Sequence, residues 1–73
     1  MTSTKTVNGV RVAELRCERG MTQHDLAAKL GVSVRTIGNV ERAKTMPDLS
    51  VLIALADLFE VSLDYLVGRT ATP

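Results

Sequence analysis

Apolar residues recur along this chain at the three- and four-residue spacing of helices, and helix-breaking residues divide the pattern into five short segments. The first predicted helix spans residues 9–19, with Val12 and Leu15 on one face and Gly20 as its stop. The sequence shows no convincing strand pattern and no internal repeat. The expected fold class is therefore all-α, a compact domain of five helices.

The second and third predicted helices are short and closely joined. Thr22 is expected to cap the second helix in a capping box with Asp25, and Gly31 ends that helix after barely two turns. Ser33 is expected to cap the third helix, which runs to about Arg42. One apolar seam lines both helices: Leu26, Leu30, Val32, Ile37 and Val40. Two helices joined by so short a turn with a glycine cross steeply, which predicts a helix-turn-helix.

A fourth helix is predicted after the break at Met46-Pro47, from an Asp48 cap through Phe59, and Ser62 is expected to cap a last short helix through Val67. One face of the fourth helix is expected to close the core: Leu49, Leu52, Ile53, Ala56 and Phe59. An adjoining apolar face carries Val51, Ala54, Leu55 and Leu58, of which Leu55 can join the core. Contiguous exposed apolar surface marks interfaces. A homodimer is therefore predicted, with the following interface residues: Val51, Ala54, Leu58 and Tyr65.

The length of 73 residues permits a single small domain. Residues 1–6 are expected to form a flexible arm, residues 7–68 the folded domain and residues 69–73 a tail. No apolar run approaches the roughly 20 residues of a membrane span, and the single Cys17 has no partner for an internal disulfide. We therefore expect a cytoplasmic protein without membrane contact.

The charges are unevenly distributed along the chain. Residues 1–45 hold eight basic and four acidic side chains, whereas residues 46–73 hold one basic and four acidic side chains. This asymmetry indicates a basic half that meets a polyanion and an acidic half that faces away from it.

The sequence does not indicate catalysis or metal binding. Cys17 and His24 belong to no cluster of ligands, and a zinc site needs about four. There is no Ser-His-Asp order, no phosphate-binding glycine loop and no pair of carboxylates in a plausible cleft. We therefore expect no enzyme activity, no metal and no cofactor.

The stretch GMTQHDLAAKLGVSVRTIGNVERAK, followed by MPDLSVLIALADLFEVSLDYLVGR, resembles the Cro/cI-type helix-turn-helix regulators, also called the xenobiotic-response-element family. The resemblance covers residues 9–68 and implies a lambda-repressor-like DNA-binding domain with its helix-turn-helix at the second and third helices. Two residues depart from the family pattern: Ala43 stands where a glycine is usual, and Gly38 lies inside the recognition helix. A left-handed backbone at Ala43 costs about 1 kcal/mol.

In that family the third helix lies in the major groove and the second crosses the phosphate backbone. The implied base-contacting residues are Ser33, Val34, Arg35 and Asn39, on an outward face that also includes Gly38. The implied phosphate-contacting residues are Gln23, Thr36, Arg42 and Lys44. Arg35 suits guanine, because a guanidinium donates two hydrogen bonds to O6 and N7. The resemblance also implies a structural ion pair between Arg16 and Glu41.

Two classes of function follow from these observations. The first is a sequence-specific regulator of double-stranded DNA of phage or bacterial type, a repressor acting as a homodimer on a palindromic operator. The second is a protein-interaction module of the same fold, such as an antitoxin or an antirepressor partner. The polar and cationic outer face of the third helix favours the first class.

Overall fold

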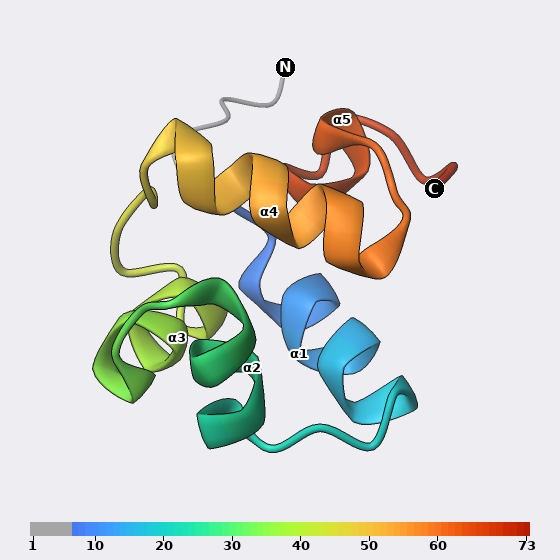
Figure 1. The fold of residues 1–73 in the computed structure, drawn as a ribbon. Helices are drawn as coiled ribbons and strands as arrows, with labels where there is room; N and C mark the ends of the chain where they lie inside the picture. The colour runs from blue at the N-terminus through green and yellow to red at the C-terminus, as the bar shows by residue number, and fades with distance from the viewer. Residues whose placement is uncertain (1–6) are drawn as a thin grey trace.

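The computed structural model describes residues 7–73, which form five helices and no strand. The helices are α1 (Gly9–Glu18), α2 (Gln23–Leu30), α3 (Val34–Glu41), α4 (Leu49–Phe59) and α5 (Leu63–Leu66). In Figure 1, α1, α2 and α3 lie together, and α4 crosses one side of this group with α5 beside it. The all-α, five-helix prediction is confirmed. The expected arm, including Lys5, lies outside the described residues.

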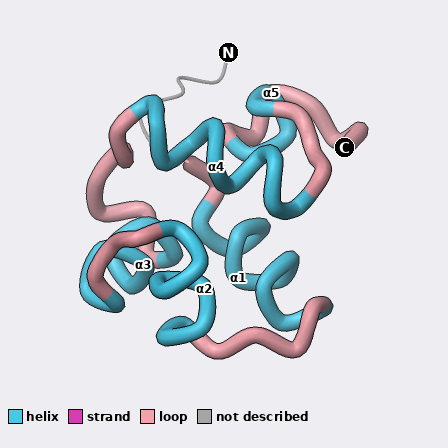
Figure 2. The backbone as a smooth tube through the Cα atoms, in the orientation of Figure 1, coloured by secondary structure: helices cyan, strands magenta, loops and turns pink. Residues whose placement is uncertain are grey.

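Side-chain caps fix where most of these helices begin. In the capping box of α2, the Asp25 amide donates to Thr22 Oγ1 over 3.0 Å and the Thr22 amide donates to Asp25 Oδ2 over 2.9 Å. Asn8, Ser33 and Ser62 accept equivalent bonds at the starts of α1, α3 and α5. Asp48 occupies the N-cap position of α4 but makes no side-chain capping bond. The prediction of that one cap is therefore wrong. Figure 2 shows the long loop that precedes α4.

A single apolar core joins all five helices. It consists of Val7, Val12, Leu26, Ala27, Ile37, Val40, Leu52, Leu55, Ala56, Phe59 and Leu66. The face that α4 turns inward differs from the prediction, because Leu49 and Ile53 are 64% and 45% exposed while Leu55 is fully buried. Apolar residues surround almost the whole circumference of α4, so periodicity alone did not select the buried side.

Arg11 of α1 and Arg19, which directly follows α1, bind carbonyl groups at or beyond the carboxyl ends of the later helices. Arg11 Nη1 donates to the Tyr65 carbonyl over 2.8 Å and to the Thr70 carbonyl over 2.9 Å, and its guanidinium stacks 4.0 Å from the Tyr65 ring centre. Arg19 Nη2 donates to the Phe59 carbonyl over 2.8 Å. A cation at the end of a helix is stabilised by the carbonyl dipoles there. Part of the basic half of the sequence therefore serves internal contacts.

Two glycines, Gly31 and Gly9, allow the tight turn and the close helix contact that position α3. Gly31 takes a left-handed conformation with φ 70°, which lets α2 end and α3 begin within a few residues. Gly9 starts α1 directly against the end of α3, where a Cβ atom would lie 2.7 Å from the Val40 carbonyl oxygen and closer still to that of Glu41. These contacts fix α3 at the surface.

No helix within residues 7–73 is long and apolar enough to cross a membrane.

Candidate nucleic-acid interface

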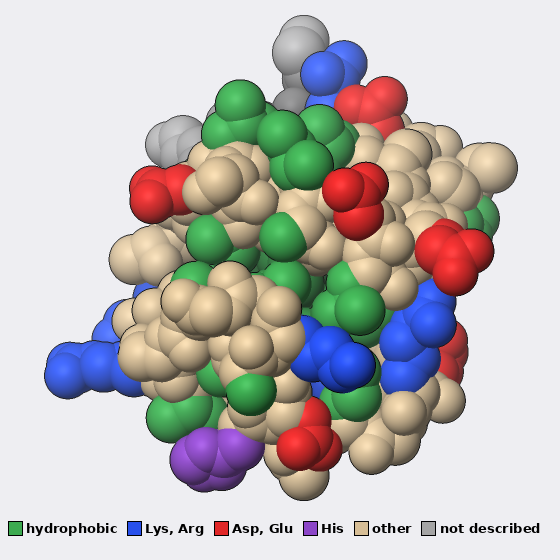
Figure 3. All heavy atoms as spheres, in the orientation of Figure 1, with side chains coloured by type: hydrophobic (Ala, Val, Ile, Leu, Met, Phe, Trp, Pro, Cys, Tyr) green, Lys and Arg blue, Asp and Glu red, His purple; other side chains and the backbone are tan. Residues whose placement is uncertain are grey.

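The outer side of α3 is polar and cationic. Ile37 and Val40 are buried in the core, whereas Arg35 and Arg42 are exposed and Asn39 is half-buried. Figure 3 shows Lys and Arg side chains projecting from the surface beside α3. The two arginines are seven residues apart, which places them on the same side of the helix, two turns from each other.

Arg35 is the side chain of this group that is free to meet a ligand. It is exposed, and within residues 7–73 its guanidinium makes no hydrogen bond or ion pair. It lies in the first turn of α3, directly after Val34, which packs against the edge of the core and thereby anchors the backbone of that turn. A rigid helix therefore presents a flexible cation at its amino-terminal end.

The hydroxyl groups of Ser33 and Thr36 cap the start of α3. Ser33 Oγ accepts a hydrogen bond from the Thr36 amide over 3.1 Å and shares another with Thr36 Oγ1 over 3.0 Å. Both side chains lie at the surface next to Arg35. Their roles toward bases and phosphates remain predictions.

The sequence predicted Gly38 on the exposed outer face of α3, and the structure differs. The glycine is buried, because the side chain of Arg42 folds back over it. Arg42 Nη2 then donates to Asn39 Oδ1 over 3.0 Å. Two residues assigned to different contacts, Asn39 to bases and Arg42 to phosphates, are thus bonded to each other.

Arg16 and Glu41 form a bidentate ion pair at the base of α3. Arg16 Nε and Nη2 donate to the two carboxylate oxygens over 2.7 and 3.2 Å, and only 15% and 8% of the two side chains are exposed. Arg16 Nη1 also donates to the Met21 carbonyl over 2.8 Å. The hydrogen bonds to Glu41 raise the pKa of Arg16 above its ordinary value, against the opposing effect of burial.

Gln23 is hydrogen-bonded to Glu41 of this ion pair, a contact that the sequence did not predict. Its Nε2 donates to Glu41 Oε1 over 2.9 Å, so the carboxylate ties together the ends of α1 and α3 and the start of α2. The two residues are 18 positions apart, and no local signal pairs them. The amide nitrogen of Gln23 is therefore occupied in this structure, and its phosphate contact remains a prediction.

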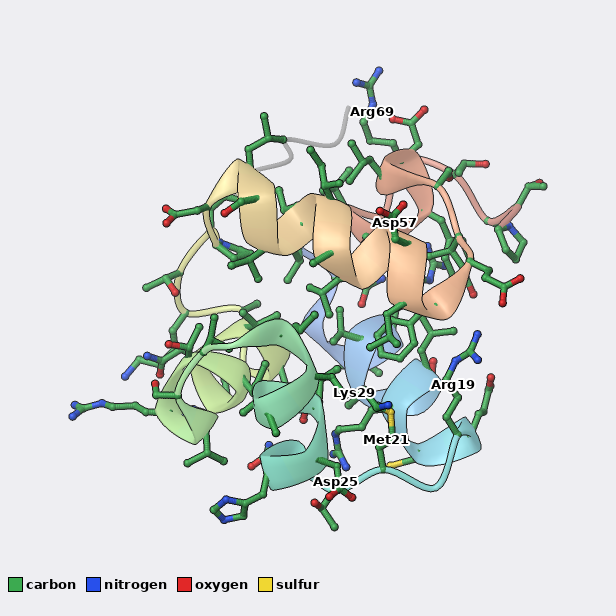
Figure 4. The ribbon with its side chains drawn as sticks, viewed as in Figure 1. Arg19, Met21, Asp25, Lys29, Asp57 and Arg69 are labelled. Carbon is green, nitrogen blue, oxygen red and sulfur yellow. The ribbon has the colours of Figure 1, made fainter. Side chains whose placement is uncertain are left out.

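The turn after α3 carries a further exposed cation. Ala43 has φ 56°, the left-handed conformation that the resemblance implied for a glycine position, and the following Lys44 amide donates to the Asn39 carbonyl over 2.9 Å. Lys44 is exposed. On α2, Lys29 is exposed near Asp25 (Figure 4).

The opposite side of the molecule is acidic. Four carboxylates are exposed there, on α4 and α5 and at their ends: Asp48, Asp57, Glu60 and Asp64. Figure 4 shows Asp57 and Arg69 on the α4 and α5 side, across the molecule from Lys29. The uneven charge of the sequence thus becomes a difference between two faces.

Within the described residues, no three histidine, cysteine or acidic side chains gather to hold a metal ion. Cys17 is an exposed free thiol. The surface of the same part of the chain has no pocket.

A comparison with family models matches residues 12–66 to one described as Helix-turn-helix. The chain belongs to this helix-turn-helix family. The Cro/cI-type resemblance is thereby confirmed.

Curated members of the helix-turn-helix family are similar in sequence. The HTH-type transcriptional regulator ImmR of Bacillus subtilis is 39% identical over 61 residues, covering 84% of this chain and 48% of ImmR. The cryptic phage CTXphi transcriptional repressor RstR of Vibrio cholerae is 34% identical over 62 residues, covering 85% of this chain and 55% of RstR. The chain therefore spans about half the length of these relatives.

Solved structures of the helix-turn-helix family share the fold. The P22 c2 repressor in complex with a synthetic operator superposes with a TM-score of 0.77 at 33% identity, covering 84% of this chain and 92% of that chain. The biofilm regulator SinR in complex with DNA gives a TM-score of 0.71 at 30% identity, covering 81% of this chain and 95% of that chain. The predicted lambda-repressor-like architecture is confirmed.

Proposed function

We propose that this domain binds double-stranded DNA in a sequence-specific manner and represses transcription, with α3 in the major groove and α2 across the phosphate backbone. The observation that carries the proposal is Arg35, an exposed guanidinium without a partner in residues 7–73, on a helix fixed to the core. The similarity to two repressor-type domains in complex with DNA supports the choice of ligand.

The proposed contacts divide by chemistry. Arg35 donates to guanine O6 and N7, Val34 contacts a thymine methyl group, and Ser33 and Asn39 offer polar groups to neighbouring bases. A second set is proposed to hold the phosphates: Gln23, Thr36 and Lys44. Phosphate contacts position the helix without reading sequence, so the two sets predict different mutant behaviour.

Two copies are proposed to bind one approximately palindromic site, with their α3 helices one DNA turn apart, about 34 Å. Figure 3 shows hydrophobic side chains gathered over α4 and near α5. Of the residues first assigned to this contact, Val51 and Leu58 are half-buried against the core, and Tyr65 is covered by Arg11. The exposure of Leu49 and Ile53 supports a contact centred on this pair, with the half-buried Ala54 at its edge.

A protein partner is the second candidate function. The SinR protein in complex with the SinI protein superposes on this chain with a TM-score of 0.72 at 30% identity, covering 81% of this chain and 58% of that chain. Sedimentation equilibrium of the wild type and of Ile53→Glu tests whether a second copy of this chain or another protein covers the exposed Leu49 and Ile53. Loss of a wild-type dimer in the variant supports self-association, whereas a wild type that stays monomeric even on a palindromic duplex favours another partner.

Equilibrium binding to a library of duplexes tests the proposed function. Arg35→Ala should lose about 1–3 kcal/mol on the preferred site and relax the choice at one base pair. Lys44→Ala should instead weaken all sequences to a similar degree and flatten the salt dependence. Equal affinities of the wild type and Arg35→Ala across the whole library would contradict the proposal.

A further inference from the structure

The middle of the outer side of α3 has no side chain of its own. Gly38 lies about one turn after Arg35 and one turn before Arg42, so these three residues form one stripe along the helix. Neighbouring turns of the stripe carry long cationic side chains, whereas residue 38 cannot reach a base edge by itself.

The guanidinium of Arg42 fills this place. A Cβ atom on Gly38 would lie 3.3 Å from Arg42 Nη1, 3.5 Å from Nη2 and 3.7 Å from Cζ. The whole end of the guanidinium therefore lies over the glycine, which is buried beneath it. Its bond runs to the side chain of Asn39 and not to the last carbonyls of α3, so Arg42 does not act as a carboxyl-terminal cap through its side chain.

Asn39 fixes the orientation of this group. Arginine carries only donors, so the atom that faces Arg42 Nη2 at 3.0 Å must be the amide oxygen of Asn39. The bond uses one of the five N–H groups of the guanidinium and leaves the others for a ligand. A long side chain that is oriented before binding loses less conformational entropy when it binds.

We infer that Arg42 reads a guanine, from the space that Gly38 leaves on the recognition helix and in the orientation that Asn39 imposes. This assignment rests on the proposed DNA-binding function and replaces the phosphate contact first expected of Arg42. Two parallel N–H bonds from a guanidinium match guanine O6 and N7. Asn39 is then a positioning residue, in addition to any base contact of its own.

A contact with phosphate alone would not require this arrangement. Phosphate contacts carry no sequence information, and phosphate accepts lysine as a point charge as well as the fork of an arginine. Glycine also destabilises a helix relative to alanine. The lack of a side chain at residue 38 therefore has a cost to α3, and base recognition by Arg42 gives a reason for it.

The test compares variants of the full chain on the duplex that the wild type selects from a random library and on all its single-base variants, by fluorescence anisotropy at fixed salt. The variants are Gly38→Ala, Asn39→Ala and Arg42→Lys, with Arg69→Lys as the matched control on the α4 and α5 side. We expect the wild type to prefer guanine at one base pair by about tenfold or more. Arg42→Lys should lose this preference and keep the salt dependence, because the charge remains.

Gly38→Ala should reduce the same preference in part, since its Cβ atom would lie 3.3 Å from Arg42 Nη1 and shift the guanidinium by a few tenths of an ångström, while thermal melting shows a domain at least as stable as the wild type. Asn39→Ala should reduce the preference in part, and Arg69→Lys should leave it unchanged. Full retention of the preference in Arg42→Lys and Gly38→Ala, or an equal weakening on every sequence, would overturn the assignment. A wild type without any preferred sequence would overturn the proposed function itself.

Discussion

Replacing Glu41 by alanine removes the acceptor of three side-chain hydrogen bonds, two from Arg16 and one from Gln23. Only 15% of the Arg16 side chain is exposed in the wild type, and without Glu41 its guanidinium keeps only the hydrogen bond to the Met21 carbonyl among the described residues. We expect Glu41→Ala to destabilise the domain strongly, because an uncompensated charge then remains in a largely buried position.

The size of the effect follows from the exposure of the pair. Removing one partner of a buried ion pair costs about 3–5 kcal/mol, and a hydrogen bond to a charged group contributes about 1.5–3 kcal/mol. Because Arg16 can recover some water, we expect a loss of about 2–4 kcal/mol. A domain of this size loses roughly 4–8 °C of Tm per kcal/mol, so Tm should fall by roughly 10–30 °C.

Melting followed by circular dichroism measures this fall, and a double-mutant cycle assigns it to the pair. Arg16→Met combined with Glu41→Ala removes both charges and should be clearly less destabilised than the sum of the two single variants. The raised pKa of Arg16 means that its stabilising contribution is complete below the pKa of the unfolded chain. The loss in Glu41→Ala should therefore be undiminished between neutral pH and about pH 10. A Tm within about 2 °C of the wild type, or strict additivity, would refute this reasoning.

Three further predictions concern the backbone and a cap. Ala43→Gly should raise the free energy of unfolding by up to about 1 kcal/mol in urea denaturation, because φ is 56° there; no gain would mean that the turn is unstrained. Gly9→Ala should lower Tm markedly, since its Cβ atom would meet the Val40 carbonyl oxygen at 2.7 Å; an unchanged Tm would contradict the close approach. Hydrogen bonds from Thr22 lower the pKa of Asp25, so the stabilisation that separates the wild type from Asp25→Asn should be present above the unfolded carboxyl pKa and vanish as pH falls through the lowered value. A difference that persists at about pH 2 would argue against this cap.

The sequence predicted what depends on neighbouring residues. The Thr22 and Asp25 capping box, the Ser33 cap and the turn at Gly31 involve residues within three or four positions of one another, and the structure contains all of them. The number of helices followed from these signals, because each one marks an end. Local chemistry was therefore sufficient for the order of elements.

Contacts between distant residues could not be read in the same way. Arg11 and Arg19 counted as part of a basic half, yet their partners lie 40 to 59 positions later in the chain. The buried side of α4 was misassigned because Leu49 and Leu55 are both apolar and only the packed neighbours distinguish them. In the candidate site, the outward position of Arg35 was predictable from periodicity, but the folding of another side chain over Gly38 was not.

The central claim is that α3 is the surface that meets DNA. It is tested most directly by mapping amide chemical shifts in an NMR titration of the domain with its selected duplex, beside a titration with a scrambled duplex. The account predicts that the largest shifts, saturable with the selected duplex, occur in α3 around Arg35 and at the start of α2, where side chains and backbone amides meet phosphates. Shifts confined to α4 and α5, or identical shifts with both duplexes, would contradict it.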